Sequence, residues 1–184
     1  MLRSGGKQGR VYSWNIKFLA MQSQQNFEIC SVVIEIEKGS NLKYEYDEKS
    51  KTFILDFVFT HDLVFPYAYG FIPGTLSGDG DTLDVFVLSS EALKQGDVRD
   101  VRAIGSIDLL DRGEEDYKII AVPCDDAAYQ TIQDVSELGG RWATDIKNFY
   151  AKLDEQKNKN TIIRGFGGAR AAIAEIQRAH EAFI

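Results

Sequence analysis

The periodicity of apolar residues changes after Pro123, and this change constrains the fold more than any other feature of the sequence. Before it, from Cys30 to about Ala121, short β-branched and aromatic runs alternate with turn signals, which is typical of successive strands. After it, apolar residues recur at helical spacing and predict two amphipathic helices, one over 142–153 and one from about Gly168 to the end. Many short strands followed by two helices predict an α+β fold, in which helices pack against a small antiparallel barrel.

The chain of 184 residues suits one domain, and it shows no internal repeat, low-complexity run or linker. Residues 1–27 differ from the rest because they contain four basic residues and no acid. We expect a disordered basic extension there, followed by the folded domain over 28–184. Two alternatives stay open for the first stretch: a transit peptide, and a start codon assigned too early, with Met21 as the true start.

Charge and cysteine content argue against several classes of function. The formal net charge is −7, from 28 acidic and 21 basic residues, and an acidic chain is a poor candidate for nucleic-acid binding. No apolar run approaches the roughly 20 residues that a membrane helix needs. Cys30 and Cys124 form no CxxC pair, which argues against a zinc knuckle or a disulfide framework and suits a reducing compartment. We therefore expect a cytoplasmic protein without nucleic-acid or membrane partners.

Three aspartates directly before an apolar strand carry the strongest chemical signal. Asp79 and Asp81 would share a face in an extended segment, and the intervening glycines would let Asp84 come round to the same place. Carboxylates held this close repel one another unless a cation neutralises them, and their oxygens suit Mg²⁺ or Mn²⁺ better than zinc. A solvated turn remains an alternative. A calcium loop of the EF-hand type is disfavoured, because its twelfth position is Ser90 and its flanks are predicted strands.

A second acidic pair, Asp111 and Asp116, lies five residues apart around a turn, and Lys118 should share a strand face with Asp116. Lys43 and Glu45 are likewise two apart on a predicted strand. Each set alone is consistent with an ordinary charged hairpin or a cross-strand ion pair. Together with the first cluster they favour phosphoryl chemistry. Two metal ions about 3.5–4 Å apart can activate water, and lysines can offset the charge on phosphate oxygens.

Five motifs occur in the order found in one known family: Val33–Ile36, Lys43–Glu45, Tyr69–Gly70, Asp79–Asp84 and Asp111–Lys118. In this order they resemble the family I soluble inorganic pyrophosphatases, whose hallmark is the D-G-D-x-x-D-V signature. The resemblance runs from about residue 30 to the C-terminal helix and implies a closed five-stranded barrel of the oligonucleotide-binding type, with helices outside. It also implies hydrolysis of pyrophosphate to two orthophosphates with Mg²⁺, or with Mn²⁺ as an alternative. The protein would form a homo-oligomer, which tends to be a hexamer in bacterial members.

The resemblance also assigns roles to the matched residues. Metal ions would be bound by four aspartates: Asp79, Asp84 and Asp116 for the tighter ion, and Asp111 for additional ions. Asp81 would accept the proton of the metal-bridging water, which becomes the nucleophile. Phosphate oxygens would be contacted by Lys43, Lys118, Tyr69 and Tyr150. Waters and lysines would be oriented by Glu35 and Glu45.

Three positions depart from the family pattern. Phe57 stands where the family has an Arg, Phe65 where it has a Tyr, and Ala151 where it has a Lys. Because a charged hydrogen bond contributes roughly 1.5–3 kcal/mol, losing two cationic ligands would lower affinity or rate by powers of ten. Two further hypotheses therefore stay open beside an active pyrophosphatase. One is a catalytically weakened metal–phosphate binding module, and the other is a phosphoanhydride hydrolase of altered specificity.

Basic side chains elsewhere could replace the missing cations. Lys147 and Lys152 lie near Tyr150 in the sequence, and Arg164 is a further candidate. Two other residues receive structural roles only, with Trp142 predicted in the core and His180 on a helix surface.

Overall fold

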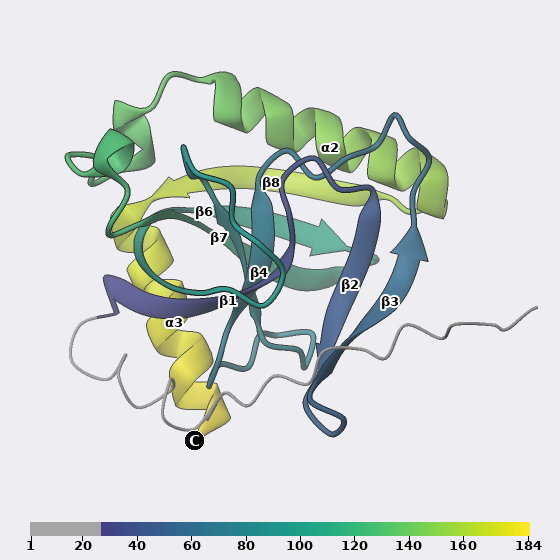
Figure 1. Ribbon diagram of the computed structural model, residues 1–184, viewed down its shortest axis with the longest axis horizontal. Helices are drawn as coiled ribbons and strands as arrows, with labels where there is room; N and C mark the ends of the chain where they lie inside the picture. The colour runs from purple at the N-terminus through teal and green to yellow at the C-terminus, as the bar shows by residue number, and fades with distance from the viewer. Residues whose placement is uncertain (1–26) are drawn as a thin grey trace, which may run out of the picture.

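The computed structural model describes residues 27–184 (Figure 1). The expected basic extension lies, except for Phe27, outside the described residues. The strands are β1 (Ile29–Ile36), β2 (Leu42–Asp47), β3 (Thr52–Val58), β4 (Ala68–Ile72), β5 (Leu83–Val87), β6 (Val98–Asp111), β7 (Glu114–Pro123) and β8 (Thr161–Gly168). The helices are α2 (Arg141–Lys157) and α3 (Ala169–Phe183), preceded by the 3-10 turns η1 (Ala127–Tyr129) and η2 (Val135–Glu137).

Five strands pair in a ring, in the order β1-β4-β5-β7-β6, because β6 also pairs with β1. The 14-residue strand β6 makes this possible: its first part pairs with β1, its second part pairs with β8, and β7 follows almost its whole length. A register shift between Ala103 and Gly105 marks an irregularity where these two parts meet, and such bulges bend a strand. The mostly-sheet architecture with two helices agrees with the expected α+β class.

One pairing differs from the antiparallel pattern that we expected. Strands β5 and β7 run parallel, with Asp84 opposite Lys118, whereas the other pairings are antiparallel. The reason is topological. The chain leaves β5 through a loop, runs along β6, and turns back into β7 at Arg112 and Gly113, both of which have positive φ. This reversal gives β7 the direction of β5.

Alternate side chains of the central strands enter two cores. On β7, Ile120 joins the cluster under α2, and Ile119 joins the cluster under α3. The ring is therefore covered on two faces, as the separate positions of α2 and α3 in Figure 1 show. Trp142 is buried in the first cluster, which confirms its predicted core position.

His180 is buried, so its predicted surface position is wrong. Its Nδ1 lies 3.0 Å from the carbonyl oxygen of Gly74, and the Phe27 ring lies 5.6 Å away. The loop after β4 is fastened to this end of α3 by a hydrogen bond from the Leu76 amide to the Ala179 carbonyl. The loop after β4 therefore covers the face of α3 that carries His180, a contact that the helical pattern of the sequence does not predict. Within residues 27–184, no helix has the length and apolar content needed to cross a membrane.

Candidate active site

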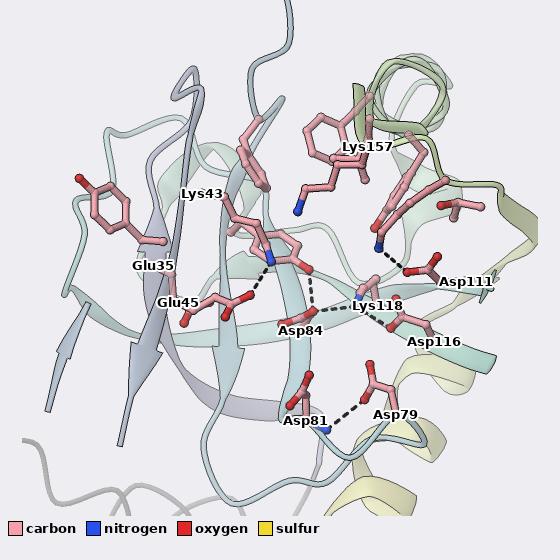
Figure 2. Close-up of a pocket in the computed structure, with 18 of the residues that line it drawn as sticks. Glu35, Lys43, Glu45, Asp79, Asp81, Asp84, Asp111, Asp116, Lys118 and Lys157 are labelled. Atoms are coloured by element: carbon pink, nitrogen blue, oxygen red, sulfur yellow. Dashed lines mark hydrogen bonds and ion pairs between the residues drawn. The ribbon is translucent and has the colours of Figure 1, made fainter. Parts of the chain in front are cut away.

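One pocket of about 320 Å³ collects the polar residues that the sequence analysis singled out. Its walls come from strands of the ring, the β2–β3 hairpin, the turn before β5 and the end of α2 (Figure 2). All eleven residues assigned to the site line it: Glu35, Lys43, Glu45, Tyr69, Asp79, Asp81, Asp84, Asp111, Asp116, Lys118 and Tyr150. Residues that are far apart in the chain therefore meet around one cavity.

The aspartate signature forms a tight turn rather than the extended segment that we expected. The Ser77 amide donates to the Asp81 carbonyl at 2.7 Å, and the Asp81 amide donates to Oδ1 of Asp79 at 3.1 Å. Gly80 has a φ of 89°, which an L side chain rarely adopts. The turn nevertheless directs both Asp79 and Asp81 into the pocket (Figure 2).

Lys118 lies at the centre of the acidic cluster. Its Nζ is 2.6 Å from Oδ2 of Asp84 and 2.6 Å from Oδ1 of Asp116. The parallel pairing of β5 and β7 sets Asp84 opposite Lys118, and Asp116 precedes Lys118 on the same strand face. Burial lowers the pKa of Lys118, but the two carboxylates more than offset this, so the net shift is upward. The buried ammonium is held charged between two carboxylates.

Burial and neighbouring negative charges raise the pKa values of other carboxylates in the pocket. The pKa of Asp81 is raised by partial burial and by the negative charges of Asp79 and Asp84. Burial likewise raises the pKa of Asp116, with Lys118 partly opposing the shift. Oδ1 of Asp111 is buried and accepts no hydrogen bond from the part of the chain that the structure describes. Clustered carboxylates with an unsatisfied buried oxygen call for a further cation.

The donor set fits a hard divalent cation. Aspartate oxygens are the ligands that Mg²⁺ and Mn²⁺ prefer, and among residues 27–184 no cysteine or histidine lines the pocket. As now oriented, no three acidic, cysteine or histidine side chains in residues 27–184 converge closely enough to hold one ion. The Lys118 ammonium instead occupies the position between Asp84 and Asp116.

Glu35 is the most deeply buried acid of the pocket, at 7% exposure. Its Oε1 accepts a hydrogen bond from the Tyr46 amide at 2.7 Å. Burial, followed by the charge of Asp84, raises its pKa from 4.5 to about 8. Glu35 is therefore largely protonated near neutral pH and can donate as well as accept a hydrogen bond.

The β2–β3 hairpin supplies a charged cluster on the rim. Lys43 donates to Glu45, and its Nζ also lies 3.0 Å from Oδ2 of Asp56 on the neighbouring strand. Burial lowers the pKa of Lys43, but these two carboxylates outweigh it and raise the pKa overall. The two acids hold the Lys43 ammonium in place and charged.

Two buried tyrosines, Tyr69 and Tyr150, line the pocket beside the acidic cluster. The Tyr69 hydroxyl donates to Oδ2 of Asp84 at 2.7 Å. Burial raises the pKa of both Tyr69 and Tyr150, so both remain neutral hydrogen-bond donors. Phe65, which lacks a hydroxyl, packs its ring 4.8 Å from Phe149 and 5.4 Å from Tyr69. It completes the aromatic wall without offering a polar contact.

Two lysines that the sequence analysis did not single out also line the pocket. They are Lys157 at the end of α2 and Lys159 just after it. Lys159 Nζ is 2.6 Å from Oδ2 of Asp111. A signal for Lys157 was available, because Tyr150, Leu153 and Lys157 are spaced three and four residues apart and share one helix face.

The three basic residues proposed as replacements do not line the pocket. Lys147 lies over the Phe166 ring at 5.5 Å, and Lys152 donates to the Asp62 carbonyl at 2.8 Å. Arg164, on β8, pairs with Asp108 at 2.7 Å and with Glu115 at 2.9 Å. For the two lysines, proximity to Tyr150 in sequence was misleading, because a helix turns successive residues to different faces.

A cavity that brings clustered aspartates together with lysine ammonium groups and tyrosine hydroxyls defines a class of protein. Such a cavity binds a small polyanion together with cations, and phosphate compounds are the ligands that satisfy both. The comparisons with known proteins narrow this class.

A sequence profile described as inorganic pyrophosphatase matches residues 32–184. The soluble inorganic pyrophosphatase of Zea mays is 40% identical over 149 residues, which cover 81% of this chain and 70% of the maize protein. The inorganic pyrophosphatase of Sulfolobus acidocaldarius is 39% identical over 155 residues, covering 83% of this chain and 90% of that protein. A solved structure of the Helicobacter pylori inorganic pyrophosphatase superposes with a TM-score of 0.82 at 34% identity, covering 87% of this chain and 96% of that chain. The chain therefore belongs to the family I inorganic pyrophosphatases.

Proposed function

We propose that the protein hydrolyses pyrophosphate to two orthophosphates by attack of an activated water molecule on phosphorus. One observation carries the proposal: the five aspartates, the two matched lysines and the two tyrosines all line the same pocket. Membership of the family supports the substrate, since its named relatives are inorganic pyrophosphatases.

Four aspartates would hold the metal ions, with Asp79, Asp84 and Asp116 for the tighter ion and Asp111 for additional ions. Mg²⁺ is the proposed metal and Mn²⁺ the alternative, on the basis of the all-oxygen donor set. When bound, divalent cations supply charge that lowers the pKa of water and neutralises the leaving phosphate. The buried, unsatisfied oxygen of Asp111 supports a cation in this part of the pocket.

Asp81 is the proposed base. Partial burial and the charges of Asp79 and Asp84 raise its pKa, so its carboxylate accepts a proton more readily than an ordinary aspartate would. It lies on a turn at the mouth of the pocket, where water has access.

Lys43, Lys118, Tyr69 and Tyr150 are the proposed ligands of phosphate oxygens. The ammonium groups carry fixed positive charge, and the hydroxyls stay protonated, so all four can donate to a polyanion. Glu45 orients Lys43 by accepting its hydrogen bond, and Glu35 supports β2 through the Tyr46 amide.

Three finer features remain proposals. The ring of five strands is proposed to be the closed barrel of the oligonucleotide-binding type, which the continuous pairing from β1 round to β6 supports. The protein is proposed to act in the cytoplasm, in keeping with relatives named soluble pyrophosphatases. It is also proposed to assemble as a homo-oligomer, with a hexamer as the expected form, and light scattering on the purified protein tests this.

Phosphate release from pyrophosphate, with Mg²⁺ present and then removed by chelation, tests the function. We expect turnover only with the metal, and a loss of about a hundredfold or more in Asp81→Asn, because the base is removed while the shape is kept. Asp125→Asn is the matched control, since Asp125 pairs with Arg99 away from the pocket.

Absence of Mg²⁺-dependent turnover in the wild-type protein would contradict the proposal. Calorimetry that shows pyrophosphate binding without hydrolysis would then favour the binding module. Faster cleavage of a nucleoside triphosphate or a longer polyphosphate than of pyrophosphate would favour altered specificity.

A further inference from the structure

Lys157 reaches into the pocket from the last turn of α2, beside Lys43 (Figure 2). Its Nζ lies 4.7 Å from the centre of the Phe57 ring and 5.7 Å from that of Phe59. Its side chain is 19% exposed. The ammonium group thus lies over two aromatic rings at the cavity wall, within cation–π distance of both.

The charge of Lys157 is poorly neutralised by the protein. Among the described residues, the one carboxylate oxygen within 4 Å of its Nζ is Oδ2 of Asp56, at 3.7 Å, beyond hydrogen-bond distance. That same oxygen already receives Lys43 at 3.0 Å. Burial and the positive charges of Lys43 and Lys159 lower the pKa of Lys157, whereas the pKa values of Lys43 and Lys118 are raised by their carboxylate partners.

The other pocket lysines each have a close carboxylate. Lys118 has Asp84 and Asp116 at 2.6 Å, and Lys159 has Asp111 at 2.6 Å. Of the pocket lysines, Lys157 is therefore the one whose ammonium group is most available to bind an anion from solution. It also lies against the ring of Phe57, the position at which the family resemblance leads one to expect an arginine.

We propose that Lys157 binds a phosphoryl oxygen of pyrophosphate and replaces, from α2, the cationic ligand that is missing at position 57. This rests on the proposed function. The anion would complete the coordination of an ammonium that Asp56 reaches only at 3.7 Å, and it would relieve the repulsion between Lys157 and Lys43.

The test compares Lys157→Met, which keeps an apolar stem against the two rings, with Lys157→Arg, which keeps the charge. We expect Lys157→Met to raise the KM for pyrophosphate about tenfold or more, as loss of a charged hydrogen bond does, and to weaken binding of inorganic phosphate in calorimetry to a similar degree. Lys157→Arg should retain most of both. Lys152→Met is the matched control, because Lys152 lies on the same helix but bonds to the Asp62 carbonyl outside the pocket.

A direct exchange provides a second readout that a purely structural role would not produce. The double variant Phe57→Arg, Lys157→Met returns a cation to the wall from β3 and should recover most of the lost affinity. Circular dichroism checks that each variant is folded, and Lys157→Gln replaces the Met variant if the latter is not. Unchanged KM and unchanged phosphate affinity in the folded, neutral variant would overturn the assignment.

The assays separate this assignment from the proposed function. If the wild-type protein binds phosphate but does not hydrolyse pyrophosphate, the proposed hydrolysis fails. The phosphate affinities of the Lys157 variants then still decide the role of Lys157. If wild-type turnover is normal and only the Lys157 variants are indistinguishable from it, the assignment fails alone.

Discussion

Glu35 lies almost fully buried against the acidic cluster, and its environment decides its protonation state. Burial and Asp84 raise its pKa from 4.5 to about 8, while the Tyr46 amide opposes the shift. The same side chain on an exposed turn would be ionised at neutral pH. Glu35 is therefore protonated near neutral pH, which its residue type alone does not predict.

This shift makes the stability of the metal-free protein depend on pH. Between pH 4.5 and about 8 the folded state retains the Glu35 proton that the unfolded state has released, so the free energy of unfolding falls as pH rises through this window. Glu35→Gln cannot titrate, and its amide oxygen can still accept from Tyr46. We expect urea unfolding from pH 5 to 8.5 to show a flatter profile for this variant, which becomes the more stable protein at the alkaline end.

The exposed Glu48, in the turn after β2, provides the control. Glu48→Gln should follow the wild-type profile. Parallel profiles for the wild type and Glu35→Gln would show that the buried carboxyl group does not carry this linkage.

At the scale of elements, the site depends on close pairing of β1 with β4. Gly70 on β4 faces Ile34 on β1, and a Cβ at Gly70 would stand 1.9 Å from the Val33 carbonyl oxygen. Tyr69 is the residue before Gly70 on the same strand, and its hydroxyl donates a hydrogen bond to Asp84 on β5. Glycine at position 70 therefore lets the backbones of β1 and β4 approach closely, and this pairing places Tyr69 within reach of Asp84.

We predict that Gly70→Ala lowers the free energy of unfolding by about 3 kcal/mol or more, because backbone atoms must separate to admit the methyl group. Gly165→Ala in β8 is the matched change, since a Cβ there meets nothing within 4 Å, and it should alter stability by less than about 1 kcal/mol. Urea denaturation of both variants measures the difference. Equal, small effects would contradict the assigned packing.

The helix α2 supplies side chains to a pocket that is otherwise built mainly from strands and turns. Its inner face carries Phe149 and Tyr150 into the core beside the pocket, and its final residue is Lys157. The αL conformation of Asn158 then ends the helix and turns the chain toward β8. Both lysines missed by the sequence analysis come from this short exit segment.

At the scale of the whole molecule, folding brings many acidic side chains together in one pocket, and lysines neutralise only part of their charge. Five aspartates and two glutamates line a cavity of about 320 Å³, and the pKa values of Asp81 and Asp116 are raised by burial and by the negative charges of Asp79 and Asp84. A divalent cation that binds only the folded state relieves this repulsion and stabilises the protein by mass action.

We therefore expect Mg²⁺ to raise the melting temperature relative to protein in a chelator. The stabilisation should reach roughly 2.7 kcal/mol when Mg²⁺ is at a hundred times its dissociation constant. Asp116→Asn removes a proposed metal ligand as well as one partner of the buried Lys118 ammonium, and it should lose most of the Mg²⁺-dependent increase whatever its melting temperature without metal. Calorimetry with and without Mg²⁺ makes the measurement. An equal increase in Asp116→Asn would place the ion elsewhere.

Much of the fold and site follows from local sequence pattern. The strands from β1 to β7, the turn at residues 111–115 and the two helices all carry short-range signals in periodicity and turn chemistry. The spacing of Asp79, Asp81 and Asp84 indicated a cation-binding acidic cluster, and these side chains do line one cavity.

What only the tertiary structure decided depends on contacts between distant parts of the chain. Strand β8, with three glycines, is not predicted from its own pattern and is stabilised by pairing with β6. The parallel β5–β7 pairing, the burial of His180, and the approach of Lys157 to Phe57 join segments that no local period relates. Sequence periodicity reports which face of an element is apolar, since that depends on neighbouring residues. Which charges meet across the pocket depends on how the elements pack, and therefore on the free energy of the whole fold.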